Sequence, residues 1–226
     1  MARFKIGLNA KDHSLLIKIQ EFFGGIGTFT FDKKSNAWIY SVSSVTELLN
    51  IIIPHFNKYV LLTQKAADFK LFVQIVQLMN KGAHLNYAGL QEIVNIKASM
   101  NKSNSVASQS KRFVKSKFPH INPVKRNTIE TANIYDLHWI SGFVSGEGNF
   151  DAGIRKATNT RKERIYLRFR LTQHVKDFKL MELIIKYLGC GRIEYDNRKE
   201  HSVLNIVVGN FSDIKNKIIP FAFGAW

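Results

Sequence analysis

The chain has 226 residues, of which 45% are hydrophobic and 17 are phenylalanines, so it contains enough apolar material for a folded core. Its 33 Lys and Arg residues against 17 Asp and Glu give a formal net charge of +16, which favours polyanionic partners such as nucleic acids or membrane surfaces. A single cysteine, Cys190, excludes an intramolecular disulfide and a cysteine-built zinc site, and the sequence has neither a bilayer-length apolar run nor a signal-peptide pattern.

The chain opens with a predicted strand in which basic and apolar residues alternate. Period-two alternation gives it an apolar face and a basic face, formed respectively by Phe4, Ile6 and Leu8 and by Arg3 and Lys5. A helix is expected next, with Lys11-Asp12 at its N-cap and a stop at glycines between residues 24 and 27. Its inward face is expected to consist of four apolar residues, Leu15, Leu16, Ile19 and Phe22.

A hairpin and a capped helix follow. The hairpin is predicted to turn at Asp32-Lys33-Lys34. Ser44 and Glu47 have capping-box spacing, so a helix is expected to start there and to end at Pro54. Two longer helices are predicted over residues 63–80 and 86–100. The inward residues of the first of these are expected to be Phe69, Phe72, Val73, Val76 and Met79.

Residues 101–133 differ in composition and are predicted to be a linker. They are polar, basic and poor in apolar periodicity, with basic residues at Lys111, Arg112, Lys115, Lys117, Lys125 and Arg126. The linker is expected either to touch phosphates or to be a plain solvated tether.

The segment from Trp139 to Phe150 combines an apolar helix with regularly spaced small residues. Gly142 and Gly146 are four residues apart, so both lie on one helical face, where a second helix could approach backbone to backbone. Glu147 is the only carboxylate of the segment and stands where the helix is expected to end, at Gly148. Two such helices would bring their acids together at one end of the contact, where they could share a metal ion.

The rest of the chain repeats the first unit. The repeated features are a strand at Arg168–Leu171, an N-cap at Lys176-Asp177, an inward helix face of Leu180, Met181, Ile184 and Leu188, a glycine stop at 189–191, a turn at Asp196-Asn197-Arg198, and a capped helix from Asn210 and Asp213 to Pro220. Cys190 is expected to be small and buried in the glycine turn.

Polar and apolar residues alternate over residues 164–171. The predicted core face consists of Ile165, Leu167, Phe169 and Leu171, and the opposite face of Arg164, Tyr166, Arg168 and Arg170. A solvated face of an amphipathic sheet is one interpretation. Three arginines on one side of a strand, with no acid between them, favour nucleic-acid contact instead.

Residues 140–148, Ile-Ser-Gly-Phe-Val-Ser-Gly-Glu-Gly, resemble the nine-residue motif of the LAGLIDADG homing endonucleases. The flanking Trp139 and Asn149-Phe150 also fit that family, and with the repeat the resemblance covers about residues 2–221. It implies an α+β fold of two pseudo-repeats, in which antiparallel DNA-binding sheets are backed by helices. Ser145 departs from the family, which often has Asp at this position.

The resemblance also assigns roles to residues. In the family two motif helices pack together, and the acid at the eighth motif position binds the divalent metal, which makes Glu147 the expected catalytic and metal-binding residue. The helix–helix contact is expected to use Ser141, Gly142, Ser145 and Gly146. The outward sheet faces of the family lie in the DNA major groove, where Arg can bridge guanine and Asn or Asp can meet adenine or cytosine. The residues expected to bind DNA are Arg3, Lys5, Thr28, Thr30, Ser41, Asn149, Asp151, Arg155, Arg164, Tyr166, Arg168, Arg170, Arg192, Glu194 and Asn205.

The implied function is site-specific, intron-homing cleavage of double-stranded DNA by hydrolysis that depends on Mg²⁺ or another divalent cation. The expected organisation is a first repeat without its motif helix at 1–100, the linker at 101–133, a second repeat without its final helices at 134–221, and an unmatched tail at 222–226. Heavy use of Lys, Asn, Ile and Phe suggests an AT-rich organelle genome and, with the family, a mitochondrial location.

One motif acid in the chain leaves three possibilities open. The chain is an inactive fragment; or its glycine face pairs with a second copy or another polypeptide, which brings two acids together; or it is an RNA-binding protein like the intron-splicing maturases, without nuclease activity and with intron RNA as its partner. No membrane partner is expected.

Overall fold

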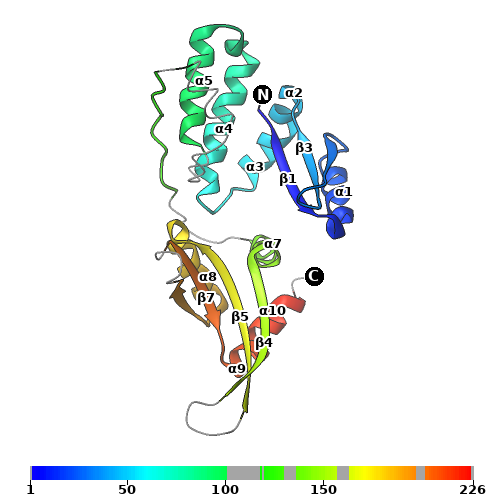
Figure 1. Ribbon diagram of the computed structural model, residues 1–226, viewed down its shortest axis with the longest axis vertical. Helices are drawn as coiled ribbons and strands as arrows, with labels where there is room; N and C mark the ends of the chain where they lie inside the picture. The colour runs from blue at the N-terminus through cyan, green and yellow to red at the C-terminus, as the bar shows by residue number, and fades with distance from the viewer. Residues whose placement is uncertain are drawn as a thin grey trace. The chain divides into compact units, whose positions relative to one another are not determined.

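The computed structural model describes residues 2–100, 118, 120–129, 136–156, 163–196 and 202–224. The chain forms two compact units, one of Met1–Leu61 with Lys65–Thr128 and the other of Leu62–Gln64 with Ile129–Trp226. Each unit combines an antiparallel sheet with helices, which confirms the predicted α+β fold (Figure 1). In the described ranges, no helix is both long and apolar enough to cross a bilayer.

The first unit is built on a three-stranded sheet with the order β1-β3-β2. Its strands are β1 (Phe4–Asn9), β2 (Thr28–Asp32) and β3 (Ala37–Val42). The turn between β2 and β3 forms where it was predicted, because the Asp32 carboxylate accepts hydrogen bonds from the Lys34 backbone N–H and the Ser35 hydroxyl. These two bonds lower the pKa of Asp32.

Helix α1 (His13–Phe22) follows the 3₁₀ turn η1 (Ala10–Asp12). The prediction that four of its residues face inward is wrong for two of them, because Leu15 is 51% exposed and Phe22 is 69% exposed. The inward stripe runs instead through Leu16, Ile19 and the residue after the helix, Phe23, which pack in the core of the first unit. The predicted cap also differs: Asp12 makes no capping hydrogen bond, whereas Asn9 accepts one from the Lys11 N–H.

The capped helices do not end at Pro54 and Pro220, which corrects a prediction made for both repeats. In the first unit α2 (Val45–Glu47), the π-helical turn η2 (Leu48–Ile52) and α3 (Ile53–Lys58) run on from one another. In the second, α9 (Phe211–Asp213), η6 (Ile214–Ile218) and α10 (Ile219–Gly224) do the same. A proline ring clashes with the carbonyl four residues earlier in an α-helix. The wider π turn, with its bond to the fifth residue back, lets the helix pass the proline.

Helices α4 (Lys65–Asn80) and α5 (Tyr87–Ser99) complete the first unit, joined by η3 (Ala83–Leu85). The predicted inward residues of α4 all lie in the core or against it. The N-cap of α5 is Asn86, whose side chain accepts a hydrogen bond from the Gly89 N–H.

The described part of the predicted linker is not a plain tether, because it is bound to α4 and α5. The contacts are Gln91 to the His120 carbonyl, the Asn122 N–H to Asn95, Ser99 to the Val124 carbonyl, and Arg126 to Asp68. The expected phosphate contacts at Lys111, Arg112, Lys115 and Lys117 lie outside the described residues.

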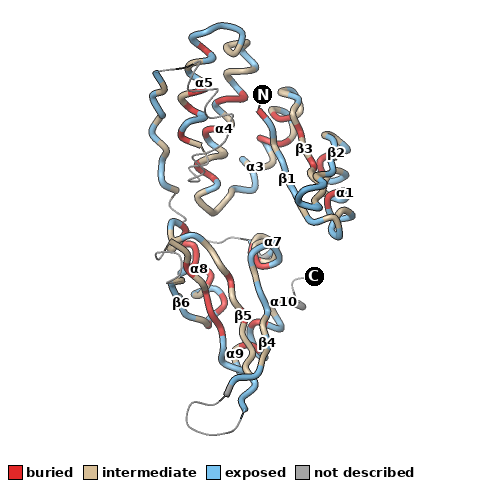
Figure 2. The backbone as a smooth tube through the Cα atoms, in the orientation of Figure 1, coloured by how far each residue is buried: buried red, intermediate tan, exposed pale blue. Residues whose placement is uncertain are grey.

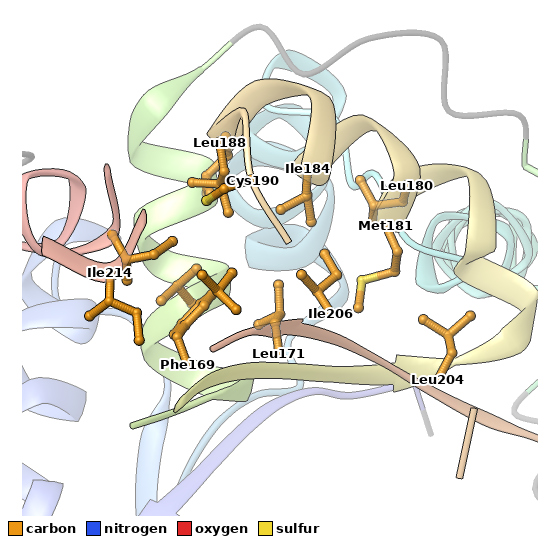
Figure 3. Packing of buried hydrophobic residues seen from close by; sticks show 14 residues of the cluster. Phe169, Leu171, Leu180, Met181, Ile184, Leu188, Cys190, Leu204, Ile206 and Ile214 are labelled. Atoms are coloured by element: carbon orange, nitrogen blue, oxygen red, sulfur yellow. The ribbon is translucent and has the colours of Figure 1, made fainter. Parts of the chain in front are cut away.

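The second unit contains a four-stranded sheet with the order β4-β5-β7-β6. Its strands are β4 (Gly148–Lys156), β5 (Glu163–His174), β6 (Arg192–Tyr195) and β7 (Val203–Val208). The 3₁₀ turn η4 (Val175–Asp177) leads into helix α8 (Phe178–Leu188). Figure 3 shows side chains of α8 pointing toward those of β5 and β7, and the four predicted inward residues of α8 are all buried. The predicted turn at Asp196-Asn197-Arg198 lies largely outside the described residues.

Each unit places one glycine in a left-handed conformation directly over its sheet. Gly27 has φ +79° and lies over Tyr40 and Val42, and Gly191 has φ +100° and lies over Ile206 and Val208. A Cβ at Gly27 would come within 2.7 Å of the Ser41 carbonyl oxygen. Glycine is therefore required for the close approach in the first unit. Beside Gly191, Cys190 is buried as predicted, and burial raises the pKa of its thiol.

The long β4–β5 hairpin extends beyond this core. Phe169 and Leu171 are buried as predicted, but Ile165 is 80% exposed, so its predicted place in the core is wrong. Its cross-strand neighbour Ile154 is 66% exposed. Figure 2 shows the exposed end of the hairpin. Alternation determines which face of the strand is apolar, whereas the reach of the helices determines how much of that face is covered.

Three residues from the first half of the chain, Leu62–Gln64, belong to the second unit. The Gln64 side chain donates to the Ile129 carbonyl and accepts from the Ile129 N–H, as a paired strand would. The Gln64 N–H donates to Asp177 at 2.7 Å. Asp177 stands at the N-cap of α8 but makes no capping bond, so its buried carboxylate serves Gln64 rather than the predicted cap.

Candidate active site and nucleic-acid interface

Helix α7 (Leu137–Glu147) carries the glycine motif. It starts after Asp136, whose side chain accepts a hydrogen bond from the His138 N–H. Ile140 and Val144 are buried in the core of the second unit, and the rings of Trp139 and Phe143 stack with centroids 4.9 Å apart. These contacts fix which side of α7 faces inward.

Gly148 ends α7 and begins β4 without an intervening loop. Its backbone is extended, with φ −81° and ψ 151°. A Cβ at this position would lie 2.3 Å from the Val144 carbonyl oxygen, so only glycine fits the change from helix to strand. This tight junction sets Glu147, the last helical residue, directly beside the first residues of the sheet.

The side of α7 that carries Gly142 and Gly146 is exposed. A Cβ added at either glycine would meet nothing within 4 Å. The Ser145 hydroxyl donates to the Ser141 carbonyl at 2.8 Å, so its one donor hydrogen is used within the helix. The second unit itself therefore does not require these two glycines for packing.

Glu147 is exposed at the C-terminal end of α7. The C-terminal end of a helix carries partial negative charge, so a carboxylate there creates a site that favours a cation. In the part of the chain that the structure describes, no group of three or more His, Cys, Asp or Glu side chains is close enough to hold a metal ion. Glu147 thus fits a divalent metal site as one ligand, and such a site needs further donors.

The outward face of the second sheet brings most of the predicted DNA-binding residues together. Cross-strand pairing joins β4 to β5 at Asp151 and Arg168 and at Arg155 and Arg164. Two longer rows cross β5 and β7, one of Asn149, Arg170, Val207 and Arg192 and the other of Thr172, Asn205 and Glu194. The face is therefore a grid of mostly polar side chains, interrupted by the buried Val207, and it lies next to Glu147 in sequence.

Two of these arginines are paired with an acid, Arg168 with an acid on the neighbouring strand β4 and Arg192 with an acid two residues along its own strand β6. Arg168 forms an ion pair with Asp151, and Arg192 with Glu194. The Arg168 pair is the less exposed, with side chains 28% and 29% accessible against 68% and 44% for Arg192 and Glu194. A pattern read along one strand does not show which residue of the next strand lies opposite.

Thr172 is part of this face although the sequence analysis did not select it. Its hydroxyl donates to the Asn205 side chain at 2.7 Å. The signal was present, because the alternation of Arg168 and Arg170 continues to Thr172 on the same strand.

The first sheet has a smaller set of such residues. Lys5, Ser41 and Thr28 form one cross-strand row over β1, β3 and β2, and Thr30 lies one step further along β2. Arg3 is exposed just before β1. The structure therefore divides the candidate residues into one group on each unit.

The model of the family described as "LAGLIDADG endonuclease" matches residues 1–76 and 140–223, which together are more than half of the chain. This chain belongs to the LAGLIDADG endonuclease family. The match includes α7 and both sheets, so it covers the glycine motif and the two candidate faces.

Curated relatives in this LAGLIDADG family come from fungi. The chain is 42% identical to "Probable intron-encoded endonuclease 3" and 38% identical to "Probable intron-encoded endonuclease 2", both of Neurospora crassa, over 97% of its own length. It spans 40% and 48% of the length of these two proteins. It thus covers about half or less of the relatives that it resembles in sequence.

Solved LAGLIDADG structures share the fold. The meganuclease I-SmaMI bound to uncleaveable DNA has a TM-score of 0.89 and 40% identity, covering 99% of this chain and 73% of that one. The I-LtrWI LAGLIDADG homing endonuclease bound to target DNA has a TM-score of 0.86 and 33% identity, covering 97% and 71%. Another I-SmaMI structure is of the enzyme bound to uncleaved DNA in the presence of calcium ions.

Proposed function

We propose that this chain acts on double-stranded DNA as a site-specific, intron-homing endonuclease that hydrolyses phosphodiester bonds. The observation that carries the proposal is the arrangement of α7 and β4: an exposed glycine stripe ends at an exposed carboxylate, and that carboxylate adjoins an arginine-rich sheet face. The two solved relatives described above, I-SmaMI and I-LtrWI, are endonucleases bound to DNA, and the two Neurospora crassa relatives carry endonuclease names.

DNA contact is assigned to the outward sheet faces. The major groove of B-DNA is roughly 12 Å wide and admits a two-stranded ribbon, which suits the long β4–β5 hairpin. The formal charge of +16 supplies sequence-independent attraction through release of counterions from the DNA. The polar grid of the second sheet and the Lys5 row of the first supply the side chains that contact phosphates and bases.

Glu147 is proposed to hold a divalent cation, Mg²⁺ under physiological conditions. A bound Mg²⁺ would supply the activation of water and the stabilisation of charge at the scissile phosphate. Within this chain, Glu147 contributes its carboxylate and the C-terminal end of α7 contributes a negative field. The further ligands include a carboxylate at the end of a second motif helix.

The exposed stripe of Gly142 and Gly146 is proposed to be the surface on which that second motif helix docks. Small residues allow two helix backbones to approach closely, and an added Cβ at either position is free of contacts in this chain. One candidate for the second helix is α7 of another copy of this chain.

We also propose a mitochondrial location, which the composition and the intron-encoded names of the relatives support.

The test is cleavage of a randomised duplex-DNA library in Mg²⁺ by the unmodified chain, by Glu147→Gln and by Glu182→Gln. Glu182 is an exposed glutamate on another helix, α8, and serves as the matched control. We expect selected duplexes to be cut by the unmodified chain and by the control, and Glu147→Gln to be slower by about three orders of magnitude. Equal cleavage by all three would remove Glu147 from the site, and no cleavage by any would contradict nuclease function for this chain.

A further inference from the structure

The β4–β5 hairpin contains a group of five outward side chains arranged around one glycine. Three consecutive outward cross-strand pairs contribute to it: Asp151 with Arg168, Gly153 with Tyr166, and Arg155 with Arg164. Successive outward positions are about 6.6 Å apart along a strand, so these groups lie within reach of neighbouring base pairs.

Gly153 forms the seat of the Tyr166 ring. A Cβ at Gly153 would lie 2.7–2.8 Å from the ring and hydroxyl atoms of Tyr166. The ring therefore lies flat against the β4 backbone, in space that any other residue at 153 would occupy. Its position is fixed by the shape of the hairpin.

The seated ring supports two arginines that differ in charge environment. The guanidinium carbon of Arg155 lies 4.0 Å from the ring centroid and that of Arg168 lies 5.6 Å away. Arg168 also forms the ion pair with Asp151. Among the described residues, Arg155 has no carboxylate within ion-pair distance.

These environments suit different parts of DNA. The Asp151 carboxylate binds one terminal nitrogen of Arg168, and the Arg168 Nε is buried, without a hydrogen-bond partner among the described residues. Only the terminal N–H groups of Arg168 remain for a ligand, in a nearly fixed orientation. A phosphate there would be repelled by Asp151, whereas guanine offers two neutral acceptors, O6 and N7, at matching spacing.

We propose that Asp151 is a positioning residue that makes Arg168 a reader of guanine, while Arg155, held by the same Tyr166 ring, contacts a phosphate. The proposal rests on the DNA-binding function proposed above. Asp151 lowers the rotational freedom of the Arg168 side chain before DNA binds, so less conformational entropy is lost when the complex forms. Because the guanidinium is held in one orientation, its terminal N–H groups are unable to reorient toward the acceptors of a different base. Arg155 keeps its full charge for the backbone.

The experiment measures the sequence preference of the whole chain for duplexes selected from a randomised library. Ca²⁺ is used in place of Mg²⁺, since it accompanies uncleaved DNA in one I-SmaMI structure. The variants are Asp151→Asn, Arg168→Lys and Arg155→Gln. Glu182→Gln is the matched control, because Glu182 is an exposed glutamate on helix α8, outside the proposed DNA-binding faces.

We expect Asp151→Asn and Arg168→Lys to lower the preference for guanine at one shared position by about tenfold. Affinity for scrambled DNA should change by less than about twofold in Asp151→Asn. Arg155→Gln should weaken binding evenly across sequences and reduce the salt-dependence slope by about one. Glu182→Gln should leave that guanine preference intact. Thermal melting of each variant checks that it is folded, and Arg168→Lys tests the same position without touching Asp151.

Two results would overturn the inference while leaving DNA binding intact: an unchanged guanine preference in Asp151→Asn, or a loss spread evenly over the whole target. A single-base effect of Arg155→Gln would equally contradict it. If the unmodified chain selects no sequence at all, the proposed function fails, and the inference fails with it before any variant is compared.

Discussion

The two units are alike in the elements that form their cores and differ in the elements that carry the candidate chemistry. Both have a strand, a 3₁₀ turn, a helix, a hairpin and a helix with a π turn, in that order. In the second unit α7 and β4 precede this shared set, and they contribute Glu147, Asp151 and Arg155. The shared elements act as a scaffold, and the added helix and strand hold the catalytic candidate and three DNA-binding candidates that pair with those of β5.

The largest expected effect tests whether the two scaffolds are independent. Ile184 is fully buried in the second unit, and Ile52 is fully buried in the first. Each isoleucine replaced by alanine should lower the free energy of unfolding of its own unit by about 2–5 kcal/mol. Chemical denaturation followed by hydrogen exchange of each unit's amides measures this. Equal loss of protection in both units from either single variant would show one cooperative unit.

The next effect separates the stability of α7 from its proposed docking role. Gly142→Ala and Gly146→Ala each should raise the stability of the second unit by up to about 1 kcal/mol, because alanine favours a helix and the new methyl group meets nothing. Gly146→Leu should reduce DNA cleavage about 10- to 100-fold by obstructing a second helix. Melting temperature and cleavage rate should therefore change in opposite directions. A Gly146→Leu variant with full cleavage would show that no helix docks on this stripe.

A smaller effect concerns matching positions in the two sheets. Tyr40 is buried opposite Ile6 in the first sheet, and Ile206 is buried opposite Leu171 in the second. The Tyr40 hydroxyl donates to the Ile26 carbonyl at 3.0 Å, and burial raises the pKa of Tyr40. Tyr40→Phe should therefore cost about 1 kcal/mol by equilibrium denaturation. An unchanged free energy of unfolding would mean that the Tyr40 hydroxyl adds no stability, and that tyrosine has no advantage here over the aliphatic Ile206 at the matching position of the second sheet.

The smallest effect is a pH response confined to the first unit. Burial, with a smaller contribution from Lys58, lowers the pKa of His55 below its ordinary 6.5. Below pH 6.5, His55 then binds fewer protons in the folded unit than in the unfolded chain. The free energy of unfolding is therefore highest above pH 6.5 and decreases as the pH falls through the pKa of His55 in the folded unit. Denaturation midpoints between pH 7.5 and pH 5, in the range set by the ordinary histidine pKa, measure this loss.

The matched variant for this response is His55→Phe, which keeps the ring contacts with Phe22, Phe23 and Phe56 and removes the titrating group. It should flatten the pH dependence of the first unit. His138→Gln, at an exposed position in the second unit, should leave it unchanged. A first unit equally stable at both ends of the pH range would contradict the assignment to His55.

Local patterns in the sequence were sufficient for most elements. Capping residues such as Ser44 and Asn210 and the alternation along β5 predicted helices and a strand, and the glycine motif predicted the family, which the comparisons confirm. The patterns could not give the inward side of α1, because that depends on which side of the helix packs on the core of the first unit. The roles of Glu147 and of the DNA-binding residues remain predictions that the proposed variants test.

Other features depend on contacts between segments distant in sequence. The ion pair of Asp151 with Arg168 follows from the register of β4 on β5, and no pattern within either strand contains that register. The exposure of Ile165 follows from how far the core helices reach. The passage of a helix through Pro54 depends on a π turn, whose wider bonding pattern the proline signal alone does not indicate.

The assignment of Leu62–Gln64 to the second unit constrains how this protein could be divided. Because these residues lie between α3 and α4 of the first unit, no single cut in the chain yields two polypeptides that each contain one whole unit. In a separately produced polypeptide of residues 129–226, the Asp177 carboxylate would lose the hydrogen bond that it accepts from the Gln64 N–H. Gene fusion or exchange of halves at the linker would therefore have to carry this three-residue segment along, or replace it with one that forms the same bonds.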